Sequence, residues 1–169
     1  ANMEYRHNKD LSASHLPILI RVIEASQGDM MEIGTGYYST PIFHLMAQMT
    51  ERHCYSYENN PEWYEKAKKY ESEYHHIILI DDWNKLPSGK RWGIVFVDQS
   101  PSQSRRVAIA KYANSADYIV AHDSEIDRQP LYHLERTLLT FKYRFDFKKL
   151  VPNTSVVSNF YDLKFLEKP

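Results

Sequence analysis

The chain of 169 residues is long enough for one domain with a sizeable core, and its 43% apolar and 25% charged residues are typical of a soluble globular protein. The net charge of −1 lacks the basic excess of nucleic-acid-binding domains, so we expect no nucleic-acid partner. No apolar run approaches the roughly 20 residues of a membrane-spanning helix, and no signal peptide is visible, so we expect no membrane association. Cys54 is the only cysteine, which excludes an intrachain disulfide and favours a cytoplasmic location.

Helices and short strands are predicted to alternate along most of the chain. Short apolar runs predict strands at residues 30–33, 53–57, 76–80, 92–97 and 118–121. Apolar residues at helical spacing predict helices at about 11–26, 41–49, 61–70, 102–112 and 130–140. No full helix fits between residues 81 and 90. Repeated βα units of this kind imply an α/β fold with a parallel sheet and helices on both of its faces.

The C-terminal tail has a different pattern. Aromatic and charged residues alternate from Phe141 to Phe147, and the period of two predicts a strand. Pro152 and Asn153 supply a turn, and residues 155–166 form a second predicted strand region. We therefore expect a single domain over residues 1–169. Its parts are an N-terminal helix region at 1–27, the βα units at 28–140 and a β-hairpin at 141–169.

Residues 30–41 predict a strand, a glycine turn and a helix. Gly34 and Gly36 can take positive φ and let another molecule approach the backbone. Thr40 and Pro41 suit the N-cap and the first position of the helix. The N–H groups at such a helix start attract the carboxylate or phosphate of a nucleotide-like ligand.

The same turn resembles a motif of a known family. The dinucleotide pattern Gly-x-Gly-x-x-Gly is broken at Ser39, whereas the run from Glu32 to Gly36 resembles the first motif of class I S-adenosylmethionine-dependent methyltransferases. An ordinary β–α turn is the alternative reading. The order of elements, ending in a hairpin, resembles that family over nearly the whole chain. The resemblance implies a doubly wound, seven-stranded, mostly parallel sheet with an antiparallel C-terminal hairpin, and S-adenosyl-L-methionine as cofactor.

Acids stand where the second and third strands end. Glu58 follows Gly34 by 24 residues, matches the second motif of the family and can accept both hydroxyls of a ribose. The resemblance implies that Asp82 contacts the adenine amino group and that Trp83 covers the ring, with Asp81 as an alternative acid. The alternative is that the two acids cap a helix and that Trp83 is part of the hydrophobic core. The expected cofactor site comprises Glu32, Gly34, Thr35, Gly36, Tyr37, Ser39, Glu58, Asn59, Asp82, Trp83 and Asp98.

The ends of the fourth and fifth strands carry the candidate catalytic residues Asp98, His122 and Asp123. Asp98 and the proline three residues later resemble the fourth motif of small-molecule methyltransferases. His122 is a candidate general base, and Asp98 and Asp123 could hold Mg²⁺ unless Arg105 or Arg106 lies between them. The alternative is that His122 bonds to backbone and Asp123 caps a turn.

These residues together predict a methyltransferase that acts on a small molecule or sugar at oxygen. The acceptor pocket would come from the N-terminal helix, the loops after the fourth and fifth strands, or the second subunit of a homodimer. A non-enzymatic S-adenosylmethionine-binding protein of the same fold and an NAD-dependent oxidoreductase are the alternatives.

Overall fold

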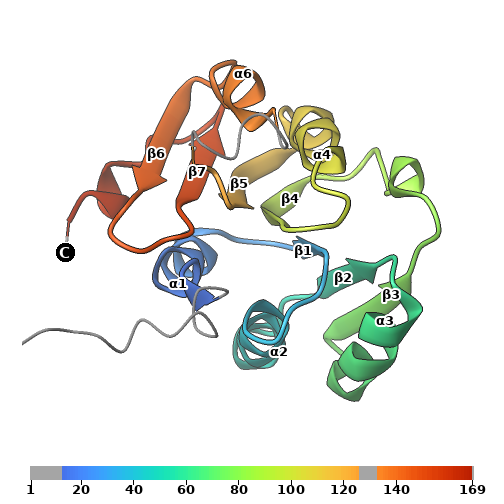
Figure 1. Cartoon of the computed structure of the whole chain (residues 1–169). Coiled ribbons are helices and arrows are strands. Elements are labelled where there is room, and N and C mark those ends of the chain that lie inside the picture. The colour runs from blue at the N-terminus through green and yellow to red at the C-terminus, as the bar shows by residue number, and fades with distance from the viewer. Residues whose placement is uncertain (1–12, 126–132, 169) are drawn as a thin grey trace, which may run out of the picture.

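The computed structural model describes residues 13–125 and 133–168, which form an α/β domain around one seven-stranded sheet (Figure 1). The strand order is β3-β2-β1-β4-β5-β7-β6. The strands are β1 (Met30–Ile33), β2 (Cys54–Glu58), β3 (His75–Leu79), β4 (Trp92–Val97), β5 (Ala116–His122), β6 (Tyr143–Phe147) and β7 (Thr154–Ser158). Strands β1 to β5 pair in parallel, and β7 is antiparallel to both β5 and β6. This topology confirms the predicted fold class.

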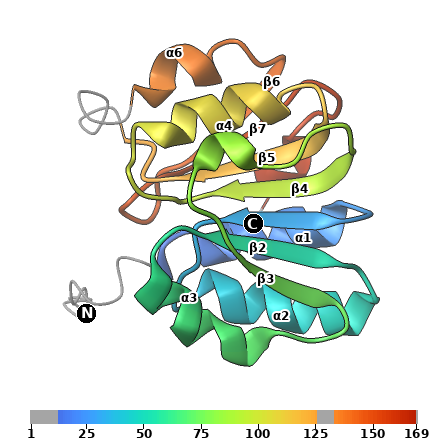
Figure 2. The same cartoon turned by 90° about the vertical axis from the view of Figure 1, so that its right-hand side faces the viewer.

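Helices cover both faces of the sheet (Figure 2). They are α1 (Leu16–Ala25), α2 (Ser39–Thr50), α3 (Pro61–Ala67), α4 (Ser104–Tyr112) and α6 (Leu134–Leu138). Helices α1, α2 and α3 lie on one side of the strands, and α4 and α6 lie on the other. Within the described ranges, no helix combines the length and the apolar character that a membrane crossing requires.

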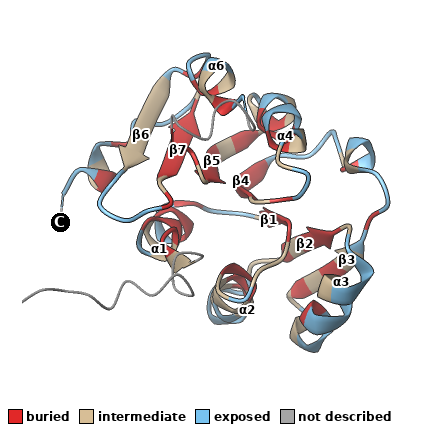
Figure 3. Ribbon diagram, in the orientation of Figure 1, coloured by how far each residue is buried: buried red, intermediate tan, exposed pale blue. Residues whose placement is uncertain are grey.

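Two apolar clusters fill the space between the sheet and these helices. Met30 and Phe96 face the α1 and α2 side, whereas Met31 and Val95 face the α4 and α6 side. Strands β1 and β4 are therefore buried on both faces, which explains why their sequences are continuously apolar (Figure 3). The predicted bounds of β1 and β4 agree with the structure.

Local capping also behaves as expected at α3. The Asn60 side chain accepts hydrogen bonds from the backbone N–H groups of Glu62 and Trp63, and Pro61 is the first helical residue. Between β3 and β4 the structure has only a short 3₁₀ turn at Trp83–Lys85. This abbreviated crossover is the one that the sequence predicts.

Several predicted boundaries differ from the structure. Helix α2 begins at Ser39 after Tyr38, so Thr40 is not its N-cap. The predicted strand over 155–166 ends at Ser158, because the Ser158 hydroxyl accepts the N–H groups of Phe160 and Tyr161 and turns the chain away. The predicted helices at 11–26 and 130–140 begin at residues 16 and 134 in the described ranges, and residues 11–12 and 130–132 lie outside those ranges.

Candidate functional site

A cavity of about 650 Å³ lies at the carboxyl ends of β1, β2 and β4. This is where the strand order reverses, since β2 and β3 lie on one side of β1 while β4 and β5 lie on the other. Open α/β sheets bind their ligands at such a point. The lining residues are His15, Gly34 to Ser39, Glu58 to Pro61, Trp63, Asp98 to Pro101 and Arg105.

The glycine turn after β1 is shaped by contact with the neighbouring strand. Gly34 has a φ of +89°, and a Cβ atom there would lie 2.7 Å from the Cα atom of Gln99. Gly34 is therefore required by the close approach of the chain's own backbone, not by the approach of a ligand as the sequence suggested. A Cβ on Gly36 would meet only the Ser39 hydroxyl, at 3.1 Å, and Gly36 does not have positive φ.

Glu32 lies beneath the glycine turn and does not line the cavity. Its carboxylate accepts hydrogen bonds from the hydroxyl of Ser39 and, at 2.9 Å, from that of Thr40. Thr40 in turn accepts the N–H of Gly36. Burial raises the pKa of Glu32 to about 7, although the bonds from hydroxyl groups lower it. Glu32 thus fixes the first turn of α2 against the glycine loop.

Glu58 lines the cavity but already has four hydrogen-bond donors. One oxygen accepts the backbone N–H of Thr35 at 2.9 Å and its hydroxyl at 2.7 Å. The other oxygen accepts the N–H groups of Asn59 and Asn60, both at 3.0 Å. An ionised carboxylate has about four acceptor sites, so a ribose hydroxyl has to replace the Thr35 hydroxyl. The ribose contact stays a prediction.

The residues expected at the adenine line a neighbouring hollow of about 340 Å³ rather than the main cavity. Asp82 accepts the N–H of Asn84 at 2.9 Å and starts the 3₁₀ turn. Trp83 donates its indole N–H to the carbonyl of Ser100 at 2.9 Å, and Asn59 donates its side-chain amide to the same carbonyl. The shared carbonyl joins the loops after β2, β3 and β4, and Asn59 borders both hollows.

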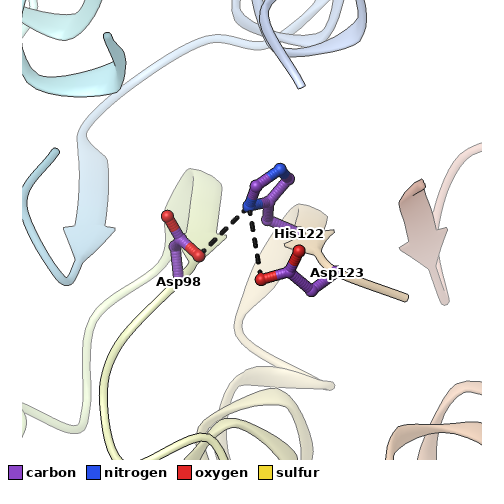
Figure 4. Close-up of side chains that lie close together, drawn as sticks. All are labelled: Asp98, His122 and Asp123. Atoms are coloured by element: carbon purple, nitrogen blue, oxygen red, sulfur yellow. Dashed lines mark hydrogen bonds and ion pairs between the residues drawn. The ribbon is translucent and has the colours of Figure 1, made fainter. Parts of the chain in front are cut away.

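Asp98, His122 and Asp123 converge at the ends of β4 and β5 (Figure 4). The His122 Nδ1 atom lies 3.3 Å from Asp98 Oδ1 and 3.7 Å from Asp123 Oδ2. The structure therefore brings together the three residues that the sequence proposed as catalytic. Their potential metal-binding atoms all lie within 4.8 Å of one another.

Arg105 already supplies a cation between the two carboxylates. Its guanidinium lies 3.3 Å from Asp98 and 3.3 Å from Asp123, and it donates to the carbonyl of Gln99 at 2.8 Å. Arg105 is buried, whereas Arg106 is exposed. The residues present do not fit the expected Mg²⁺ site, because the guanidinium and His122 neutralise the carboxylates that would bind the ion.

The hydrogen bonds of His122 define its protonation. The Ser14 hydroxyl donates its single proton to the carbonyl of Pro152 at 2.6 Å, so toward the Nε2 atom of His122, at 3.1 Å, it can only accept. The Nδ1 atom faces the Asp98 carboxylate, which also only accepts. Both ring nitrogens therefore carry a proton, and His122 is an imidazolium. This geometry does not support the expected role as a general base.

The charges in this cluster shift the pKa values of His122 and Asp98 in opposite directions, and both shifts favour the charged form. Burial alone would lower the pKa of His122, but the hydrogen bond with Asp98 and the charges of Asp98 and Asp123 raise it. Burial would raise the pKa of Asp98, but the hydrogen bond with His122 and the charges of His122 and Arg105 lower it. Asp98 therefore stays ionised beside the cavity.

Two cavity-lining residues, His15 and Gln99, do not feature in the sequence prediction. Both are buried, and in the part of the chain that the structure describes their side-chain nitrogen and oxygen atoms have no hydrogen-bond partner. His15 precedes α1, far from every motif in the sequence. Only the packing of α1 beneath β4 brings it to the cavity, so no local signal could have identified it.

Comparison with known proteins supports the fold. No family model and no curated protein matches the sequence. A putative O-methyltransferase from Klebsiella pneumoniae has a TM-score of 0.62 at 12% identity, covering 94% of this chain and 83% of its own. Cofactor-bound Rv0187 from MTB has a TM-score of 0.64 at 15% identity, covering 95% and 84%. The chain therefore has the fold of class I S-adenosylmethionine-dependent methyltransferases.

A third similar structure corrects one expectation. The hMettl16 catalytic domain in complex with the MAT2A 3′UTR hairpin 1 has a TM-score of 0.58 at 11% identity, covering 90% of this chain and 70% of that domain. The same fold therefore occurs in a protein bound to RNA. The exclusion of nucleic acid from net charge is wrong, because net charge sums over the whole chain whereas RNA contacts one surface of a fold.

Proposed function

We propose that this protein is an S-adenosylmethionine-dependent methyltransferase. The observation that carries the proposal is the cavity at the reversal of strand order, lined by the glycine loop and Glu58 at one end and by Asp98 at the other. Its volume lies in the range of small-molecule sites. Likeness to a putative O-methyltransferase and to cofactor-bound Rv0187 adds support.

The residues present fit the cofactor in chemical type. The loop from Gly34 to Ser39 would hold the amino-acid end, and Glu58 would hold the ribose once the Thr35 hydroxyl turns away. Asp82 and Trp83 would hold the base in the neighbouring hollow. The cofactor, when bound, supplies a methyl group already activated on sulfur, so the protein has mainly to align donor and acceptor.

We propose that Asp98 binds the methyl acceptor. Its ionised carboxylate can accept a hydrogen bond from an acceptor hydroxyl and hold the oxygen toward the methyl group. Arg105 and His122 keep that carboxylate ionised and fixed in place. The volume of the cavity favours a small molecule or sugar as acceptor, and the Klebsiella pneumoniae neighbour favours transfer to oxygen. The RNA-bound neighbour favours an RNA acceptor.

Two measurements test the proposal. Isothermal titration calorimetry with S-adenosylmethionine and NAD, each in turn, should give binding of the first and none of the second. Incubation with labelled S-adenosylmethionine and panels of small hydroxyl compounds or RNA hairpins should then yield S-adenosylhomocysteine. NAD binding alone would indicate an oxidoreductase, and cofactor binding without turnover on either panel would indicate a non-enzymatic binding protein.

A further inference from the structure

A second hollow, of about 470 Å³, adjoins the cavity on the side of α3. The linings of the cavity and of this hollow share residues 35–37 and Trp63, so one ligand can extend from the first into the second. The rest of the hollow is lined chiefly by α3 and the 3₁₀ turn at Lys68–Tyr70 that follows it. Asp98 lines the cavity and not the second hollow, which therefore lies away from the proposed site of methyl transfer.

Two aromatic side chains stand where the cavity and the second hollow meet. The ring of Tyr37 is 4.7 Å from the ring of Trp63, measured between centroids, and the two planes are tilted by 59°. A third ring stacked between them would need a separation of about 7 Å, so none fits there. The Tyr37 side chain is nevertheless 65% exposed. Its open face at the mouth of the cavity offers a stacking surface to a planar ligand.

Lysine and glutamate side chains line the same hollow. Lys66 is paired with Glu62 at 3.1 Å, and Glu65 is paired with Lys68 at 3.7 Å, so these four charges balance. Across residues 13–125 and 133–168, no carboxylate forms an ion pair with Lys69. The hollow therefore has a surplus of one positive charge, at the exposed ammonium of Lys69, which suits one phosphate group.

The aromatic and cationic groups together indicate the class of ligand. A neutral ring could stack on Tyr37 but would leave Lys69 without a partner, and a simple anion would use Lys69 but not the aromatic surface. A nucleotide uses both, because its base has a flat face and its phosphate is an anion. The volume of the hollow is in the range of small-molecule sites, which is enough for one nucleotide.

We propose that the second hollow binds one nucleotide of a single-stranded nucleic acid, with its base on Tyr37 and its phosphate at Lys69. Unpaired strands suit this site, because their bases can turn outward onto aromatic side chains. The inference rests on the proposed function for the role of the strand as methyl acceptor. Since Asp98 lies in the cavity, the nucleotide in the hollow would be the neighbour of the one that is methylated.

Fluorescence anisotropy with a labelled oligouridylate tests the binding without turnover. A length of about ten nucleotides covers a typical single-strand site. The titration is carried out at several salt concentrations, with and without S-adenosylhomocysteine. Oligothymidylate of the same length and free UMP, used as competitors, distinguish RNA from DNA and from a mononucleotide. We expect the oligouridylate to bind with an affinity that falls as salt rises, and UMP to compete weakly because it places no second nucleotide in the cavity.

Tyr37→Leu tests the stacking surface. Because the side chain is largely exposed, the variant should unfold at the same temperature as the wild type, and it should bind the oligouridylate roughly tenfold more weakly. Tyr161→Leu is the matched control. Tyr161 is also an exposed tyrosine, at 49%, but it stacks on Tyr118 and lies outside both hollows, so its loss should leave the affinity unchanged.

Lys69→Gln tests the phosphate contact through its salt dependence. Losing one contact to a single strand should make the slope of log affinity against log salt concentration shallower by about 0.7. Lys68→Gln changes the adjacent exposed lysine, which is paired with Glu65 and does not line the hollow. The slope of this control should stay close to that of the wild type.

The outcomes separate this inference from the proposed function. No binding of either oligonucleotide at low salt overturns the inference, and so do folded Tyr37→Leu and Lys69→Gln variants with wild-type affinity and slope. UMP that competes as well as the strand overturns the assignment to a strand. If S-adenosylhomocysteine fails to bind while oligonucleotide binding depends on Tyr37 and Lys69, the proposed function fails and the nucleotide site stands. Turnover on small hydroxyl compounds without oligonucleotide binding gives the opposite result.

Discussion

The carboxylates in and behind the two sides of the cavity wall have different hydrogen-bond partners. On the β1–β2 side, Glu32 and Glu58 accept hydrogen bonds only from neutral hydroxyl and backbone N–H groups. On the β4–β5 side, Asp98 and Asp123 face the cations of Arg105 and His122. Backbone N–H and hydroxyl donors fix a carboxylate relative to the nearby backbone. Cationic side chains neutralise the charge of a carboxylate, and its position then depends on how those side chains pack.

The difference separates the tasks of the two halves. Glu32 and Glu58 order the segments that would surround a cofactor, because their donors belong to the loops after β1 and β2 and to the first turn of α2. The Asp98 cluster keeps an ionised group beside the cavity. Substitutions on the β1–β2 side and on the β4–β5 side should therefore affect different properties of the protein, and by different amounts.

The largest effect is expected where the two halves touch. Gly34→Val would place a Cβ atom 2.7 Å from the Cα atom of Gln99 and force a branched residue to a φ of +89°. Overlap and backbone strain together should lower the free energy of unfolding by roughly 4 kcal/mol. Urea denaturation followed by circular dichroism measures this loss. Gly36→Ala, whose Cβ meets only the Ser39 hydroxyl, should lose less than about 1 kcal/mol. Equal losses for the two variants would contradict the packing at Gly34.

The next largest effect is expected on the β4–β5 side, where Asp98 and Asp123 face Arg105 and His122. Arg105→Ala removes the cation between Asp98 and Asp123 and leaves both acids partly buried. We expect a loss of about 3 kcal/mol in the free energy of unfolding, since removing one member of a buried ion pair is strongly destabilising. Arg106→Ala changes the exposed neighbour on the same helix and should stay within about 0.5 kcal/mol of the wild type. A small loss for Arg105→Ala would mean that His122 alone neutralises the acids.

Features that depend on local sequence could be predicted well. Continuous apolar runs defined β1 and β4, and the order of βα units with a terminal hairpin defined the sheet. The Asn60 cap was predictable because its bonds span only two or three residues. The strand after the last turn was extended too far, because the Ser158 hydroxyl ends it through bonds that a period of two does not reveal.

Features that depend on contacts between distant segments were harder to predict from the sequence. Strand order placed Asp98 near Asp123, and Arg105 was foreseen as an alternative to a metal. The protonation of His122, however, depends on Ser14, which lies 108 residues away, and on a proton donated to Pro152. Residue types at strand ends thus indicate which groups meet, but not which partner holds the proton.

A smaller effect is expected for cofactor binding on the β1–β2 side, where the donors to the carboxylates are uncharged. Glu58→Ala removes the acceptor of the proposed ribose contact and four internal bonds, so S-adenosylmethionine affinity should fall roughly ten- to a hundredfold, or about 1.5–3 kcal/mol. Calorimetry measures the change. Glu62→Ala, an exposed acid on α3, is the control. A loss under threefold for a folded Glu58→Ala variant would assign Glu58 to loop structure alone.

The smallest effect is a pH slope at Glu32. Burial raises its pKa from the ordinary 4.5 to about 7, so between these values the folded protein binds more protons than the unfolded chain. The contribution of Glu32 to the free energy of unfolding should therefore fall as pH rises through this window, by at most about 1.4 kcal/mol per pH unit, and level off above pH 7, whereas the lowered pKa values of His15 and His75 contribute with the opposite sign. Glu32→Gln removes this titration and keeps a side chain of the same shape, so the free energy of unfolding of the wild type minus that of the variant should fall as pH rises from 5 to 7. Urea denaturation between pH 5 and pH 8 measures the difference, with Glu24→Gln, an exposed acid on α1, as the control for lost charge. If the Glu32→Gln and wild-type profiles run parallel, the hydrogen bonds from Ser39 and Thr40 stabilise the ionised carboxylate enough to offset its burial. Glu32 would then be as readily ionised as Asp98, and the two sides of the cavity would not differ in this respect.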